Sequence, residues 1–219
     1  QTHMIVCEIY PFHTSNGIVY GCPSFSHRDI HLTFDDGPSN VTSHLLDTLK
    51  YYNIKATFFI IGVKALKYPD IVKKIKNEGH TIGSHTLSHK NLTFLESIGN
   101  YSEIEREILE NEQVLKNITG VRPWLFRPPY GAITLNIKKY LNHHNYTVVM
   151  WNGGNVDWFY KDMNKQTEML LMGMADAGGI VCFHDRVPDT SKNISIFIKA
   201  FMDEQHKFIS SEECLAENM

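Results

Sequence analysis

The chain has 219 residues, of which 42% are hydrophobic and 21% charged, and its formal net charge is −3 at pH 7. This length predicts one or two domains, and the apolar fraction excludes an intrinsically disordered chain. The slightly acidic charge argues against a nucleic-acid partner, because domains that bind nucleic acids carry a basic surface. No apolar run approaches the length of about 18 residues that a membrane-spanning helix needs, so we expect no membrane span.

Short apolar runs alternate with longer amphipathic segments, a pattern typical of an α/β fold. The predicted strands cover residues 31–34, 56–61, 80–84, 124–126, 146–151 and 180–183. The predicted helices begin near residues 40, 69, 102, 134, 168 and 194. The chain shows no linker-like stretch and no repeat of fixed period, and we therefore expect a single domain over residues 1–219.

Two of these helices have recognisable ends. Pro69 marks the start of one helix, and Gly79 marks its end. Ser102 and Glu105 have the spacing of a capping box in front of a long helix that Gly120 ends. These residues predict where the two helices begin and end.

Every polar cluster of chemical interest follows a predicted strand. The clusters are Asp35–Asp36, His85 with His89, the loop 127–131 (Arg-Pro-Pro-Tyr-Gly), Asp157–Trp158 and His184–Asp185. In parallel α/β architectures the functional site lies at the carboxyl ends of the strands. The placement of the clusters therefore predicts one site at that edge of the sheet.

The first two clusters have the residue types of a catalytic metal site. Two adjacent carboxylates can divide the work, one binding a metal and one moving protons, although Asp-Asp-Gly-Pro is also a favourable turn sequence. On a helix or in a tight turn, His85 and His89 would present both imidazoles on one side, although two surface histidines are the alternative. Two histidines and one aspartate form a three-ligand set with open positions, as catalytic metal sites have.

The later clusters offer groups that position and protonate a substrate. Two prolines stiffen the loop 127–131, and Gly131 permits an unusual backbone angle, so this loop can present a backbone N–H donor. Arg127 can hold a carboxylate, and Asp157–Trp158 joins an acid to a flat apolar wall. His184, at the end of the last predicted strand, has a natural position for a general acid.

In this order the motifs resemble those of the polysaccharide deacetylases, the NodB-homology group of carbohydrate esterase family four, which includes chitin and peptidoglycan deacetylases. The resemblance covers residues 30–208, with an N-terminal extension over 1–29 and a C-terminal tail over 209–219. It implies an irregular, incomplete (β/α) barrel. It also implies a monomeric, metal-dependent enzyme that removes N-acetyl groups from a β-1,4-linked N-acetylglucosamine polymer or oligomer.

The resemblance implies a metal and a base. Asp36, His85 and His89 would bind one divalent metal, with zinc expected and cobalt as the alternative. Asp35 would take a proton from the attacking water, and the positive charge of Arg127 would keep Asp35 ionised.

The resemblance also implies an oxyanion donor and an acid. The backbone N–H of Tyr130 would stabilise the tetrahedral oxyanion, and Trp158 would form a wall of the acetyl pocket. His184 would protonate the leaving amine, and Asp157 would support the charge network of Arg127 and His184.

Two positions depart from the family pattern. Gly154 stands where the fourth motif usually has a further aspartate, which predicts a more flexible loop and one charge fewer. Cys182 stands where the fifth motif usually has a leucine that lines the acetate pocket. Both departures bear on substrate choice and turnover.

These departures leave other functions open. The second hypothesis is a metal-binding homologue with little turnover that acts as a carbohydrate-binding or cell-surface protein. A third is a two-histidine-one-carboxylate iron oxygenase, in which the pair Asp35 and His184 would be superfluous. Among deacetylase substrates, a neutral chitin-like polymer suits the acidic chain better than an acidic polymer, and peptidoglycan is the other candidate.

The four cysteines show no zinc-ligand spacing. Cys182 lies in an apolar run, which predicts a buried free thiol. Cys22 precedes the first barrel strand and Cys214 follows the last helix, so we expect a bridge between them, with Cys7–Cys214 as the alternative. A bridge across so long a loop could stabilise the fold by up to about 4–5 kcal/mol.

N-glycosylation sequons occur more often than chance predicts, which favours a secreted or cell-surface glycoprotein. Their asparagines are Asn40, Asn91, Asn100, Asn117, Asn145 and Asn193.

Overall fold

The computed structural model of the chain describes residues 14–15, 17–22, 28–154, 157–174 and 177–215. The strands are β1 (Thr14–Ser15), β2 (Ile18–Val19), β3 (Asp29–Gly37), β4 (Thr57–Ile60), β5 (Thr81–Ser84), β6 (Leu125–Phe126), β7 (Thr147–Val149), β8 (Gly153–Gly154), β9 (Gly179–His184) and β10 (Lys207–Phe208). The α-helices are α1 (Thr42–Tyr51), α2 (Gly62–Lys67), α3 (Pro69–Asn77), α4 (Leu92–Ser97), α5 (Tyr101–Thr119), α6 (Leu135–His143), α7 (Met163–Met174), α8 (Pro188–Asp203) and α9 (Ser211–Leu215). A short 3₁₀ turn, η1, covers Pro129–Gly131.

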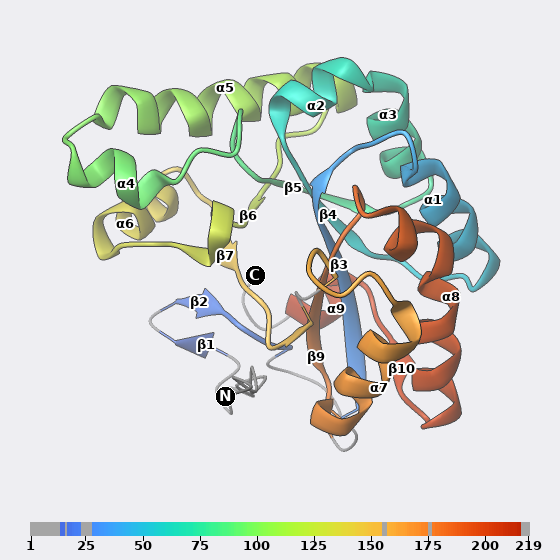
Figure 1. Ribbon diagram of the computed structural model, residues 1–219. Helices are drawn as coiled ribbons and strands as arrows, with labels where there is room; N and C mark the ends of the chain where they lie inside the picture. Colours follow the sequence, from blue (N-terminus) through green and yellow to red (C-terminus); the bar gives the residue numbers. More distant parts are fainter. Residues whose placement is uncertain (1–13, 16, 23–27, 155–156, 175–176, 216–219) are drawn as a thin grey trace.

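The strands form one curled sheet in the order β1-β2-β7-β6-β5-β4-β3-β9-β8, with β10 paired to β3. Neighbouring strands from β2 to β8 are parallel, and β1 pairs antiparallel with β2. Helices lie around the outside of the curl (Figure 1). Within the described residues β1 and β8 end the order without pairing to each other, so the sheet is an open barrel. The predicted incomplete (β/α) barrel is confirmed.

The central strand β3 divides its side chains between helices and barrel interior. Leu32 and Phe34 belong to a hydrophobic cluster with side chains of α1 and α8. Thr33 and Asp35 alternate with them along the strand, and their polar atoms contact Arg127 instead. Because successive side chains of a strand point to opposite faces, this alternation brings polar groups into the barrel at the carboxyl end of β3.

All the predicted strands and helices are present, with shifted ends. The helix predicted near residue 40 begins at Thr42, and the one predicted near residue 168 begins at Met163. The short helices α2 and α4 were not predicted, because each covers too few residues to show a helical period. Across the described residues, no helix combines the length and apolar character that crossing a bilayer requires.

The predicted capping box of Ser102 and Glu105 is wrong. Asn100 is the N-cap of α5, and its side-chain oxygen accepts a hydrogen bond of 3.3 Å from the backbone N–H of Glu103. Ser102 lies inside the first turn and donates to the same oxygen at 3.3 Å. Asparagine is among the strongest N-cap residues, and it lies two positions upstream of the expected cap.

The same geometry accounts for two of the sequons. Asn91 caps α4, and the hydroxyl of Thr93 donates to its side-chain oxygen at 2.7 Å, as Ser102 does to Asn100 at the start of α5. An asparagine followed two residues later by a hydroxyl is therefore a helix-start arrangement here. Glycosylation stays a prediction.

The predicted bridge is confirmed: Cys22 and Cys214 form a disulfide, with a Cα–Cα distance of 4.7 Å and a sequence separation of 192 residues. It ties the segment before β3 to α9. Cys182 is free and buried, as predicted. Cys7, the alternative partner, lies outside the described residues.

We expect the double replacement of Cys22→Ser and Cys214→Ser to lower the free energy of unfolding by about 2–5 kcal/mol, because the bridge restricts the unfolded chain over a long loop. Urea unfolding followed by circular dichroism measures this. Added reductant should destabilise the wild-type chain and leave the double variant unchanged. Equal unfolding midpoints for the two proteins in non-reducing buffer would contradict the prediction.

Candidate active site

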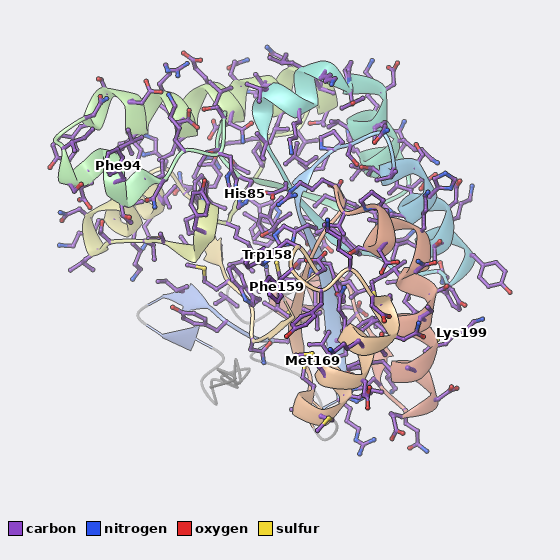
Figure 2. The ribbon with its side chains drawn as sticks, viewed as in Figure 1. His85, Phe94, Trp158, Phe159, Met169 and Lys199 are labelled. Carbon is purple, nitrogen blue, oxygen red and sulfur yellow. A yellow bond between two sulfur atoms is a disulfide. The ribbon has the colours of Figure 1, made fainter. Side chains whose placement is uncertain are left out.

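The carboxyl ends of the barrel strands surround a cavity of about 400 Å³. In Figure 2, His85 and Trp158 lie near the centre of the molecule, where these strand ends meet. The cavity is lined by Asp35, Asp36, His85, His89, Pro128, Tyr130, Gly131, Trp151, Trp158, His184 and Arg186. The structure thus brings residues from all the predicted clusters together in one place.

An irregularity in β3 turns two adjacent carboxylates into the same cavity. Neighbouring strand residues normally face opposite sides. Here the pairing of β3 with β4 shifts between Asp35 and Gly37, and Asp36 has a φ of 68°. Such a bulge re-aims a side chain. A Cβ on Gly37 would clash with the carboxyl of Asp185, so glycine is required directly after the two carboxylates. The turn-like sequence Asp-Asp-Gly-Pro therefore forms part of the site.

The two histidines lie in the loop after β5, which is not helical. His89 and Thr86 have positive φ angles of 63° and 65°. The Nε2 atoms of His85 and His89 lie 3.4 and 3.1 Å from Oδ1 of Asp36. This tight loop, rather than a helical turn, brings both imidazoles to one carboxylate.

The hydrogen bond of His85 determines which of its nitrogens is free. Its Nδ1 lies 2.6 Å from the backbone carbonyl oxygen of Arg127, which can only accept. Nδ1 therefore carries a proton, and Nε2 is the nitrogen that faces Asp36. Metal-binding histidines are commonly oriented by such a bond.

The donor atoms of Asp36, His85 and His89 fit a divalent cation. One ligand atom from each residue lies within 4.8 Å of the others. Oδ1 of Asp36 is buried and accepts no well-directed hydrogen bond from the described residues. Burial acts to raise the pKa of Asp36, but its contacts with both histidines and Arg186 outweigh this and hold the pKa well below its usual range. Two imidazoles and an ionised carboxylate are ligands that zinc and related metals accept.

The loop that carries His89 is held by α5, which the sequence analysis did not include in the site. The carboxylate of Glu107 accepts hydrogen bonds from the backbone N–H of Ser88, at 2.8 Å, and from its hydroxyl. Asn111 donates to the hydroxyl of Ser84 at 2.9 Å. Both side chains are fully buried. In the sequence, their burial was indicated only by their position on the apolar face of the predicted helix, beside Ile108.

Arg127 is fully buried and fixes Asp35. Its Nη1 donates to Oδ1 of Asp35 and to the hydroxyl of Thr33, each at 2.7 Å. Its Nε and Nη2 donate to the carbonyls of Val149 and Met150 at 3.0 and 2.7 Å. The expected contact between Arg127 and a carboxylate is therefore present in the structure.

Cys182 does not line the cavity, contrary to expectation. Its thiol is fully buried and donates to Oδ2 of Asp35 at 3.4 Å, from below the carboxylate. The register of β3 with β9 pairs Cys182 with Thr33, two residues deeper in the barrel than the pair Asp35–His184. Burial raises the pKa of the Cys182 thiol well above its ordinary value, so the sulfur keeps its proton.

His184 is paired with Asp157. Its Nδ1 donates to Oδ1 of Asp157 at 2.6 Å, and its backbone N–H donates to Oδ2 at 2.8 Å. Burial acts to lower the pKa of His184, but the bond and charge of Asp157 outweigh it, and the pKa is raised. The other described bond of Asp157 comes from Thr190 at 2.8 Å, and no described bond joins it to Arg127. Among the described residues, Asp157 therefore supports His184 rather than Arg127.

Part of the cavity lining is aromatic. Tyr130, with a φ of 63°, packs its ring 4.7 Å from that of His89. Trp151 and the half-exposed Trp158 also line the cavity. A Cβ on Gly131 would lie 2.9 Å from the Trp151 ring, and the φ of Gly131 is 64°, so this wall requires glycine.

Gly154 is not in a flexible loop. It forms β8 with Gly153 and pairs with Cys182 of β9. Its φ is 89°, and a Cβ would lie 2.6 Å from the carbonyl oxygen of Cys182. An aspartate therefore does not fit this backbone. The loss of the family's aspartate at position 154 goes together with the pairing of β8 and β9.

The two residues that follow His184, Asp185 and Arg186, were not assigned a role from the sequence. Asp185 is buried and accepts a hydrogen bond of 2.9 Å from the hydroxyl of Thr42, and burial raises its pKa to about 7. Arg186 lines the cavity, and its Nε donates to Oδ2 of Asp36 at 2.7 Å.

Comparison with known proteins decides the family. A family model described as polysaccharide deacetylase matches residues 23–149. The chain belongs to the polysaccharide deacetylase family. It is 40% identical over 161 residues to a peptidoglycan-N-acetylglucosamine deacetylase of Bacillus cereus, with 73% of this chain and 57% of that protein aligned. It is 33% identical over 195 residues to PgdA of Listeria monocytogenes, with 89% of this chain and 40% of that protein aligned. The chain thus spans about half the length of these curated relatives.

Solved structures give the same result for the fold. The crystal structure of the Bc1960 peptidoglycan N-acetylglucosamine deacetylase superimposes with a TM-score of 0.80 at 32% identity, covering 89% of this chain and 91% of that one. The peptidoglycan deacetylase PdaC of Bacillus subtilis gives a TM-score of 0.78 at 28% identity, covering 88% and 92%. The fold expected from the motifs is therefore that of the family.

We expect His85→Ala to abolish metal retention, because it removes one of three ligands. Zinc per chain, measured by mass spectrometry after dialysis, tests this. His44→Ala, at an exposed position on α1, is the matched control and should keep its metal. Full zinc occupancy in the His85 variant would refute the ligand assignment.

We expect Asp157→Asn to move the basic limb of the pH–activity profile to lower pH. The charge of Asp157 raises the pKa of His184, and an acid works only while protonated, so its removal makes activity disappear at a lower pH. The pH dependence of kcat/KM measures the change. Asp47→Asn, an exposed position on α1, should leave the limb in place, and an unmoved limb in Asp157→Asn would contradict the role of this pair.

Proposed function

We propose that this chain is a metal-dependent deacetylase that hydrolyses N-acetyl groups on the N-acetylglucosamine residues of peptidoglycan. The observation that carries this proposal is the placement of a carboxylate and an imidazole, our proposed base and acid, in one cavity with three candidate metal-ligand side chains. Asp35 and His184 both line it, together with Asp36, His85 and His89.

The residues suit amide hydrolysis. A divalent cation held by Asp36, His85 and His89, which we propose to be zinc, would supply Lewis acidity to the acetyl carbonyl. Asp35, fixed by Arg127, would accept a proton from the attacking water. This arrangement addresses the first difficulty of the reaction, since an amide is a poor electrophile.

The departure of the amine requires a proton donor. His184 has a raised pKa because Asp157 holds it, so it would deliver that proton to the amine nitrogen. The backbone N–H of Tyr130 would stabilise the oxyanion, and Trp158 would wall the acetyl group. Asp157 would keep the imidazole in one orientation.

The proposed polymer rests on the relatives. Several carry the name peptidoglycan-N-acetylglucosamine deacetylase, and PdaC of Bacillus subtilis, 33% identical over 187 residues, is named a peptidoglycan-N-acetylmuramic acid deacetylase. These names favour peptidoglycan over the chitin-like polymer that the acidic net charge favoured. A cell-surface or extracellular location follows from such a substrate, and the Cys22–Cys214 disulfide fits an oxidising compartment. That the chain is a single domain and a monomer stays a prediction.

The two departures from the family pattern do not favour a homologue without turnover. Gly154 fits the pairing of β8 with β9, and Cys182 adds a donor to Asp35. The base, the acid and the ligands are all kept. An iron oxygenase would have no use for a carboxylate and an imidazole each held by a charged partner, Asp35 by Arg127 and His184 by Asp157.

We expect the zinc- or cobalt-loaded chain to release acetate from peptidoglycan, and Asp35→Asn to reduce this release about 10²–10⁴-fold, as loss of a general base does. Acetate assays on peptidoglycan and chitooligosaccharides, with metal content measured alongside, test both points. Absence of acetate from every substrate despite bound metal would overturn the proposed function.

A further inference from the structure

The wall of the cavity carries one strongly basic side chain among the described residues, that of Arg186. It lies in the turn after β9, two residues beyond His184, and its side chain is 45% exposed. Arg127, the other arginine of the site, is fully buried behind Asp35. An anion in the cavity would therefore meet Arg186.

The guanidinium of Arg186 is held in place but only partly used. Its Nε donates to Oδ2 of Asp36 at 2.7 Å, and among the described residues this is the one hydrogen bond of the side chain. The two Nη groups carry four further N–H donors. An arginine that served a single carboxylate would commonly bind it through two parallel hydrogen bonds, which is not the geometry here. The two Nη groups of the guanidinium are therefore available to a second acceptor.

The other full charges of the site are paired. Asp35 is bound to Arg127 and Asp157 to His184, and Asp36 belongs to the metal ligands. Arg186 also pairs with Asp36, but a divalent cation held by Asp36, His85 and His89 would more than balance that carboxylate. The Nη groups of Arg186 would then give the cavity a further positive site, although the chain as a whole has a net charge of −3.

We propose that Arg186 is a specificity-determining residue that binds a carboxylate on the sugar next to the N-acetylglucosamine undergoing deacetylation. The inference rests on the proposed function and names the substrate feature that this site selects. In peptidoglycan each N-acetylglucosamine is flanked by N-acetylmuramic acid, whose lactyl group ends in a carboxylate or continues into an acidic peptide. In chitin the same position carries a neutral hydroxyl. A planar guanidinium matches a carboxylate through paired hydrogen bonds.

The test compares two oligosaccharides of equal length. One consists of alternating N-acetylglucosamine and N-acetylmuramic acid without peptides, and the other is a chitooligosaccharide. Because Arg186 also contacts Asp36, Arg186→Gln will slow both reactions. The ratio of the two kcat/KM values within one variant divides out that common loss.

We expect Arg186→Gln to lower the ratio of carboxylate-bearing to neutral substrate about tenfold, the value of a hydrogen bond to a charged group. Arg186→Lys keeps the charge without the fork and should retain part of the preference. Lys199→Gln is the matched control: it removes one positive charge from α8, at the right edge of Figure 2 and away from His85, and should keep the wild-type ratio.

An equal fall for both substrates in Arg186→Gln would overturn the inference and leave Arg186 as a positioning residue for Asp36. Failure of the proposed function has a different signature, namely no acetate from either substrate with the metal-loaded wild-type chain. In that case calorimetric binding of the carboxylate-bearing oligosaccharide decides the inference. Tighter binding to the wild-type chain than to Arg186→Gln supports it, and equal binding contradicts it.

Discussion

The buried ion pair of Arg127 and Asp35 is the interaction on which the site depends. Taking both charges out of water is costly unless further hydrogen bonds satisfy them. Here the guanidinium also donates to Thr33 of β3 and to the carbonyls of Val149 and Met150. The backbone carbonyl of the same arginine accepts the Nδ1 proton of His85. One residue therefore holds both the proposed base, Asp35, and a candidate metal ligand, His85, so these two parts of the site share one support.

The bulge in β3 lets two adjacent carboxylates do different work. Without it, Asp35 and Asp36 would face opposite sides of the sheet. With it, both line the cavity but in different surroundings: Asp35 contacts Arg127 and the thiol of Cys182, whereas Asp36 contacts two imidazoles and Arg186. The environment, rather than the residue type, would separate the proposed proton acceptor from the proposed ligand, which is the general way in which paired carboxylates divide roles.

The sequence predicted six of the strands, the clusters at their ends and the disulfide, because these depend on apolar runs, motif order and position along the chain. It did not predict the features that depend on contacts between distant segments. Gly153–Gly154 has a poor strand propensity, yet pairing with β9 makes it a strand. Glu107 looked like an ordinary polar position in a helix, and only its buried contact with Ser88 shows its use. The depth of Cys182 below Asp35 depends on the register between β3 and β9. The alternation of side chains along a single strand does not predict that register.

The net charge of the chain and the charges in the cavity favour different substrates: the former a neutral polymer, the latter an acidic one. A net charge of −3 is spread over the surface of 219 residues, and salt screens its field within about 8–10 Å under physiological conditions. It therefore affects how often an acidic polymer approaches more than whether it binds. At contact distance the Nη groups of Arg186, which make no described hydrogen bond to Asp36, would act on a carboxylate directly. Arg186, on the cavity wall, is thus a better guide to the preferred polymer than the composition of the chain.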